Sequence, residues 1–314
     1  SAGSEVKATG NYPAARERIA YMPRDLDEFA NYVRMTVQHY RDRLHVWEIL
    51  NEPIYTDYAL PRQKGYRVED YVQLLKVAYQ AVKEADPNAF VVGGIAGSPD
   101  LYTKEFIEAG GLDWVDALNL HIYPGLAAPE SYEEPLKALR EQMRGKRVEV
   151  SASSIRGNVG HSPGIWFTEG AYYADDDKPF EPYQSTWLKP LDSEVEAAEW
   201  QVKFNTILLA YGVEKIIYHS GTPGSLNNES LDGIFFEWNG APRKMLVTQA
   251  AMAKLLPEST RPLGLMRAPE MVKAYGFEAG GRTVIVAWME ENAEPLKISL
   301  PGTRWQAVDI QGND

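Results

Sequence analysis

The chain has 314 residues, a formal net charge of −12 at pH 7, and hydrophobic and charged contents of 44% and 24%. These values are usual for a globular protein, and the length suffices for one large domain or a barrel with a small appendage. The negative charge disfavours nucleic acid and anionic membrane surfaces as partners. The sequence holds no cysteine, which excludes disulfides and thiolate metal sites.

No membrane span is predicted, because no apolar run reaches about 18 residues. The first ten residues, SAGSEVKATG, lack the charged start and apolar core of a signal peptide. The cysteine-free composition suits several compartments, and we favour a secreted or periplasmic one.

Periodic apolar positions predict an alternation of helices and strands after a polar N-terminal loop. The first predicted helix begins at Asp25, because aspartate often caps the N-terminus of a helix. The predicted helices cover residues 25–40, 69–85, 99–109, 134–143, 193–211 and 243–256. The predicted strands cover residues 46–50, 89–94, 115–121, 164–169 and 214–219, with a further alternating stretch at 147–151.

From residue 268 onward the apolar pattern changes to a period of two. Short alternating runs separated by glycine and asparagine predict a small antiparallel β-domain. We expect its strands at 271–277, 283–288, 296–300 and 306–310. The predicted domains are therefore a catalytic α/β portion, residues 1–260, and an accessory β-domain, residues 261–314.

Glutamates occur where two of the predicted strands end. The apolar run at 46–50 is followed by Asn51, Glu52 and Pro53, and the proline prevents the strand from continuing. A second run, at 164–168, ends in Glu169. Parallel α/β folds place their chemistry at such strand ends. The alternative is that each carboxylate only caps the following loop.

A third strand end carries the sequence Asn-Leu-His-Ile-Tyr-Pro, residues 119–124. His121 and Tyr123 are two residues apart, so at strand spacing their side chains share a face. Without the two glutamates, core packing would be the default explanation of this pair.

The order of these three motifs resembles glycoside hydrolase clan A, whose members are retaining enzymes with a (β/α)8 barrel. The phrase WEILNEP, residues 47–53, is most similar to the family 39 group of xylosidases, iduronidases and exopolysaccharide hydrolases. The resemblance implies a TIM-barrel type α/β fold of which this chain holds strands four to eight.

The resemblance also implies roles. Glu52 would be the acid/base and Glu169 the nucleophile of a retaining mechanism, which needs carboxyl groups about 5 Å apart. Asn51 would hold the sugar 2-hydroxyl, Tyr123 would donate to the nucleophile, and His121 would touch the substrate or its neighbours.

Aromatic residues supply further substrate-binding candidates. Tyr172, Trp187 and Trp238 lie on predicted loops, where stacking on sugar and simple packing are equally plausible. Clan members often end strand eight in tryptophan; here His219 or Tyr218 stands in that region. We expect no cofactor and no metal, since the Asp175–Asp177 run lacks the alternate spacing of a calcium loop.

Five predicted strands fall short of the eight that close a barrel. We therefore expect the first three β/α units in a second chain or another segment, or absent altogether; the rival is a truncated fold that closes by dimerisation. The arginine and histidine that many clan members carry on strands two and three have no counterpart here.

The function implied is hydrolysis of β-glycosidic bonds in an oligo- or polysaccharide by a two-glutamate double displacement. One alternative is a transglycosylase using the same site. Another is a non-catalytic carbohydrate-binding or assembly subunit.

Overall fold

The structure is a computed structural model. It describes residues 20–99, 101–144, 163–174, 176, 190–219, 233–237, 240–289, 302 and 304–313. In this part of the chain, every helix is too short or too polar to cross a membrane.

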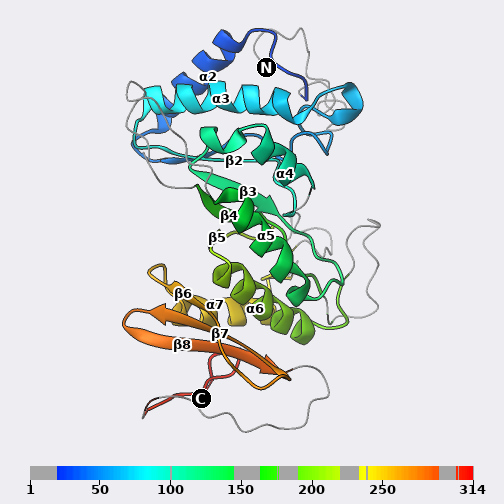
Figure 1. Cartoon of the computed structure of the whole chain (residues 1–314), viewed down its shortest axis with the longest axis vertical. Coiled ribbons are helices and arrows are strands. Elements are labelled where there is room, and N and C mark those ends of the chain that lie inside the picture. Colours follow the sequence, from blue (N-terminus) through cyan, green and yellow to red (C-terminus); the bar gives the residue numbers. More distant parts are fainter. Residues whose placement is uncertain are drawn as a thin grey trace. The chain divides into compact units, whose positions relative to one another are not determined.

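A five-stranded parallel sheet with helices between its strands confirms the predicted α/β fold (Figure 1). The strands, in sheet order, are β1 (Val46–Glu48), β2 (Phe90–Gly93), β3 (Ala117–His121), β4 (Gly164–Glu169) and β5 (Val213–Ile216). Val46 of β1 pairs with Phe90 of β2 in parallel register. Because the sheet order equals the chain order, the helices between consecutive strands connect neighbouring strands, as in a (β/α) barrel.

All six predicted helices are confirmed: α2 (Leu26–Tyr40), α3 (Val68–Ala85), α4 (Leu101–Glu108), α5 (Glu133–Met143), α6 (Glu194–Ala210) and α7 (Lys244–Leu255). Two of their starts show the expected capping. The Asp25 carboxylate accepts hydrogen bonds from the backbone amides of Asp27 and Glu28, and the Ser193 hydroxyl accepts one from Glu196. Short 3-10 helices at Arg62–Lys64, Gly111–Trp114 and Pro129–Tyr132 were not predicted.

The chain divides into two compact units, one of residues 1–121 and 138–168, the other of residues 122–137 and 169–314. In the first unit, α2 and α3 pack an apolar cluster, which includes Val37 and Val82, against the sheet residue Val91. The predicted boundary between a catalytic and an accessory domain at residue 260 stays a prediction.

Strand β1 differs from its prediction. It ends at Glu48 rather than near Leu50, and Val46 is 49% exposed although it belongs to an apolar run. Within the described residues, β1 lies at the edge of the sheet and pairs with β2 alone. An edge strand keeps one side open, so an apolar sequence does not guarantee burial there.

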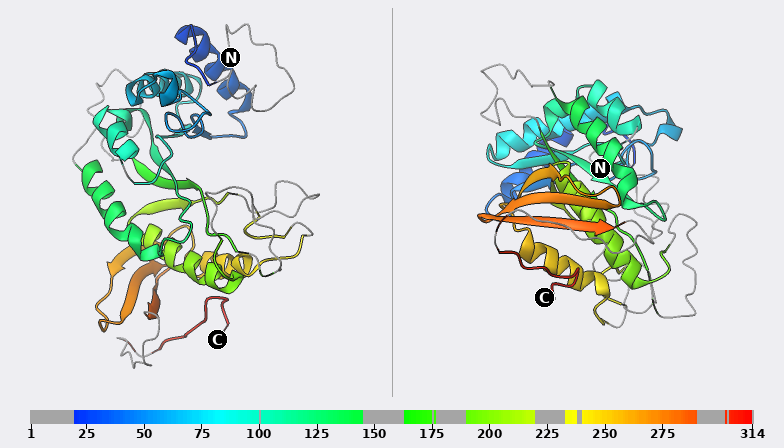
Figure 2. Two further views of the ribbon diagram at one scale, coloured as in Figure 1. Left: turned by 90° about the vertical axis from the view of Figure 1, so that its right-hand side faces the viewer. Right: turned by 60° about the horizontal axis from the view of Figure 1, so that its bottom comes forward.

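The second unit contains the predicted antiparallel sheet, in the order β6-β7-β8 (Figure 1 and Figure 2). Its strands are β6 (Arg261–Leu265), β7 (Val272–Ala279) and β8 (Arg282–Met289), and the glycines at 280 and 281 form the β7–β8 turn with positive φ. Strand β6 was missed, because its proline and glycine disguise the alternation. The prediction at 306–310 was wrong: that segment has no regular structure. The stretches at 147–151 and 296–300 lie outside the described residues.

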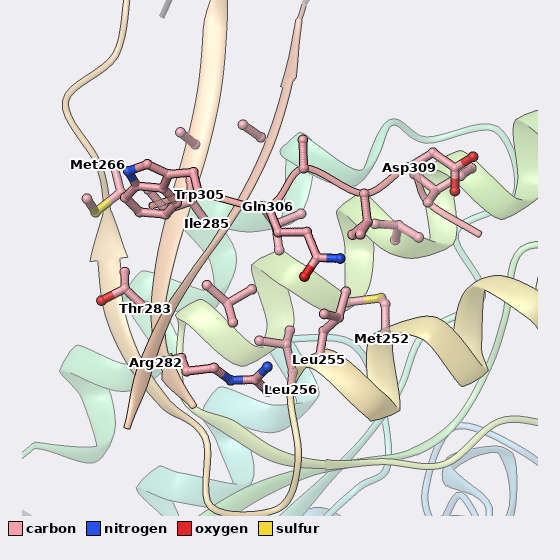
Figure 3. Close-up of a pocket in the computed structure, with 18 of the residues that line it drawn as sticks. Met252, Leu255, Leu256, Met266, Arg282, Thr283, Ile285, Trp305, Gln306 and Asp309 are labelled. Atoms are coloured by element: carbon pink, nitrogen blue, oxygen red, sulfur yellow. The ribbon is translucent and has the colours of Figure 1, made fainter. Parts of the chain in front are cut away.

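A cavity of about 780 Å³ lies in the second unit, between the end of α7, strand β8 and residues 304–310 (Figure 3). Its lining is mainly aliphatic and includes Leu255, Leu256 and Ile285, with polar side chains such as Arg282 and Gln306 among them. None of the predicted site residues lines it.

Candidate active site

The loop that carries Glu52 has a strained backbone. Leu50, Glu52 and Ile54 have φ angles of 64°, 43° and 77°, in the left-handed region that non-glycine residues avoid. Each such residue costs on the order of 1–3 kcal/mol and persists only where its surroundings fix it. Ile54 is fully buried, and its backbone bonds Ala59 and Arg62 on both sides. The surrounding fold thus holds Glu52 in a left-handed backbone conformation that a glutamate residue normally avoids.

Glu52 is paired with His121, a contact that the sequence did not predict. The Glu52 Oε1 atom lies 3.0 Å from His121 Nδ1, and only 13% and 4% of the two side chains are exposed. Either partner can carry the shared proton, since a neutral imidazole nitrogen accepts from a carboxylic acid and a protonated one donates to a carboxylate. The contact therefore fixes the position of the Glu52 carboxyl group against the His121 ring.

Asn51 is exposed beside this pair. Within the described part of the chain its side chain makes no hydrogen bond, so its amide is open to a ligand. Its proposed contact with a sugar hydroxyl stays a prediction.

Glu169 ends β4 and is paired with Tyr123. The Tyr123 hydroxyl donates a hydrogen bond of 2.5 Å to Glu169 Oε1. The backbone fixes both ends of this contact, because the Ile122 amide donates to the Glu169 carbonyl at 3.0 Å. The hydrogen bond therefore fixes the position of one carboxyl oxygen of Glu169.

The Tyr123 ring contacts two other aromatic rings. It lies parallel to that of Tyr173, with centroids 6.4 Å apart, and edge-on to His219 at 6.2 Å. The Tyr173 hydroxyl donates to the His219 carbonyl at 2.7 Å. His219 is exposed, and its backbone amide bonds the Gly170 carbonyl next to Glu169. The structure thus brings His219 to the Tyr123–Glu169 pair.

Tyr172 has to be removed from the substrate-binding set. It is 1% exposed, its hydroxyl donates to the Ala127 carbonyl at 2.6 Å, and its ring packs edge-on against Trp200 and Phe204. Burial raises the pKa of its hydroxyl. A side chain so enclosed cannot stack on a sugar. Trp187 and Trp238 lie outside the described residues.

Sequence reasoning missed a polar layer on the same strands. Glu48 of β1, Asn119 of β3 and Thr168 of β4 are joined by hydrogen bonds. A signal was present: Glu48 is a charged residue inside an apolar run, and Asn119 lies two residues before His121, on the same face of its strand.

Five parallel strands in chain order, connected by helices, place the described part of the chain in the α/β class. No family model matches the chain. Solved structures do, and they share its fold. One is a family 39 glycoside hydrolase from the gut symbiont Bacteroides cellulosilyticus WH2, at a TM-score of 0.58 and 16% identity over 88% of this chain and 52% of that one.

Two further solved structures match at a similarly low sequence identity and over a similar share of their length. A family 39 β-xylosidase from Caulobacter crescentus aligns at a TM-score of 0.52 and 20% identity, over 83% of this chain and 53% of its own. A glucosidase from Croceicoccus marinus aligns at 0.57 and 15%, over 82% and 52%. The chain has the fold of family 39 glycoside hydrolases, and spans about half the length of these proteins.

Proposed function

We propose that this chain carries both catalytic carboxylates of a retaining glycosidase acting on β-linked oligo- or polysaccharides. The observation that carries the proposal is the pairing of each candidate glutamate with a different partner, Glu52 with His121 and Glu169 with Tyr123. Two carboxyl groups in different surroundings are what an acid and a nucleophile require. The shared fold with family 39 enzymes supports the assignment.

In the first step, the Glu169 carboxylate attacks the anomeric carbon and forms an ester bond to it. The glycosidic carbon–oxygen bond breaks, and Glu52 gives its proton to the leaving oxygen. In the second step, Glu52 takes a proton from water, the water oxygen bonds to the anomeric carbon, and the ester breaks. His121 suits this cycle, because its Nδ1 atom can accept a hydrogen bond from the protonated Glu52 carboxyl group and donate one to the ionised carboxylate.

Two alternatives share this fold. In a transglycosylase a sugar hydroxyl replaces water in the second step, so adding a sugar acceptor would divert product from hydrolysis to a longer glycan. A non-catalytic subunit would bind glycan but release no product. The names of the matched structures make aryl β-xylosides and aryl β-glucosides the first probes.

Replacing Glu52 by glutamine should affect substrates according to their leaving groups. Hydrolysis of xylobiose or cellobiose, whose leaving groups need a proton, should fall about 10²- to 10⁴-fold in kcat/KM. Attack on a dinitrophenyl β-glycoside needs no proton, so the first step should persist and release a burst of dinitrophenol. Glu69→Gln, at an exposed position of α3, is the control. Equal losses on both substrates would contradict the role of Glu52 as an acid.

We also propose that a further β/α segment, from the same polypeptide or another, covers the open edge of β1 and the outer face of α2. Tyr32 and Met35 of α2 are 64% and 62% exposed, and Val46 of β1 is 49% exposed. Parallel sheets are normally covered on both faces, and an open strand edge with apolar neighbours is a site of pairing. One added strand would pair with the edge of β1, and one added helix would cover the outer face of α2.

Methionine oxidation tests this surface in the intact protein. Met35 is more exposed than Met271, which is 39% exposed. Exposure alone would therefore make Met35 the faster to react with peroxide. We expect Met35 to react several-fold more slowly than Met271, because the added segment covers it. Faster oxidation of Met35 would contradict the proposal, and protection that appears only at high protein concentration would assign the surface to a second copy.

A further inference from the structure

Glu48 connects three strands through a single oxygen atom. Its Oε1 accepts a hydrogen bond of 2.6 Å from Asn119 Nδ2 on β3 and one of 2.8 Å from Thr168 Oγ1 on β4. The bond from Asn119 is shorter than an ordinary neutral N–H···O bond, as expected for a donor to a charged acceptor, and the bond from Thr168 has the usual O–H···O length. The carboxylate of β1 thus reaches past β2 to the next two strands of the sheet.

The backbone of β2 leaves room for this reach. Gly94 follows β2 with a φ of +152°, and a Cβ atom there would lie 2.5 Å from Asn119 Oδ1. Any other residue at position 94 would displace the Asn119 amide. Asn119 is 1% exposed, and within the described residues its Oδ1 accepts no hydrogen bond. An unsatisfied buried oxygen is unfavourable for folding, so stability alone does not explain why the amide is turned toward Glu48.

The two residues that Glu48 holds stand next to the candidate catalytic groups. Asn119 precedes His121 by two positions on the same strand face, and His121 contacts Glu52. Thr168 directly precedes Glu169 in the chain. These hydrogen bonds therefore fix two strand segments. One segment carries His121, which contacts Glu52, and the other carries Glu169.

We propose that Glu48 is a positioning residue for the reaction, acting through Asn119 and Thr168; the inference rests on the proposed function. A displacement of about 1 Å at reacting groups can lower a rate about 10²-fold. Loss of Glu48 should therefore reduce kcat rather than substrate binding.

Two substitutions at position 48 separate this role from a structural one. Glu48→Gln keeps an Oε1 atom that can accept both bonds, so kcat should stay within about threefold. Glu48→Ala removes both bonds, and kcat per active site should fall about 10- to 100-fold with KM changed less than about threefold. Active sites are counted by trapping the covalent intermediate, which keeps any unfolded fraction out of the rate. Glu69→Ala on exposed α3 is the control.

The combination with Thr168→Val provides a second measurement. Since both bonds end on Glu48, the Glu48→Ala, Thr168→Val double variant should be no slower than Glu48→Ala alone. An intact protein without activity on any β-glycoside would refute the proposed function. An active protein that Glu169→Gln abolishes, but that keeps its full kcat with Glu48→Ala, would overturn only the role of Glu48.

Discussion

Replacing Glu169 by glutamine should lower kcat on aryl β-glycosides by about 10³- to 10⁵-fold, the largest effect expected of any substitution in the chain. Glutamine keeps the size of the side chain and can still accept from the Tyr123 hydroxyl, which lies 2.5 Å from Glu169 Oε1. It cannot attack the anomeric carbon. Sugar binding should therefore persist while turnover is lost. Glu214→Gln, on an exposed position of β5, is the matched control.

The anomer of a rescued product would assign the two roles. With Glu169→Gly, azide can enter from the face of the missing carboxylate, form a carbon–nitrogen bond and expel the aryl oxide, which gives the α-glycosyl azide from a β-glycoside. With Glu52→Gly, azide attacks the glycosyl-enzyme instead of water and gives the β-azide. The reverse pattern would exchange the roles, and full activity of Glu169→Gln would refute the nucleophile.

The sequence was sufficient for the helices and parallel strands because their signals are local. Val33 and Val37 recur on one helical face and are buried together, and Pro87 lies just beyond the end of α3. The strand-end position of Glu169 could likewise be predicted, since an apolar run that stops at a glycine marks the end of a strand. Glu52 instead lies four residues beyond the end of β1, in the loop that follows it.

Properties that depend on neighbours distant in sequence could not be predicted. Val46 has a strand sequence but is half exposed, because its exposure depends on what lies beside β1. Tyr172 follows Glu169 closely in the chain, yet contacts with Phe204 and the Ala127 carbonyl bury it. The sequence within a few residues of Val46 or Tyr172 does not indicate whether the side chain is exposed or buried.

The polar layer beneath the site shows the same limit. Glu48 was hidden inside the apolar run that predicted β1, and its partners lie 71 and 120 positions away. The sheet order brings them together, and the missing side chain of Gly94 leaves room for the Asn119 amide. The charged residue in the run was visible in the sequence, but its partners were not.

Replacing Lys83 by methionine should destabilise the protein by about 3–5 kcal/mol, because it leaves a buried carboxylate without its cation. Lys83 Nζ lies 2.7 Å from Asp116 Oδ2 and also donates to the Ala89 carbonyl at 2.5 Å. Only 8% and 5% of the Lys83 and Asp116 side chains are exposed. The same Asp116 oxygen accepts from the Val91 amide at 2.7 Å, so the pair ties α3 to the starts of β2 and β3. Urea unfolding of the variant measures the loss.

The neighbouring residue on α3 supplies the control for this effect. Glu84 accepts from Arg34 at 2.8 Å, but the two side chains are 48% and 34% exposed. Arg34→Met should therefore cost only about 0.2–1 kcal/mol. Adding Asp116→Asn to Lys83→Met removes the stranded charge and keeps an oxygen for the Val91 amide, so it should recover part of the stability. If the double variant is no more stable than Lys83→Met, the loss comes from missing packing around the lysine rather than from the buried carboxylate.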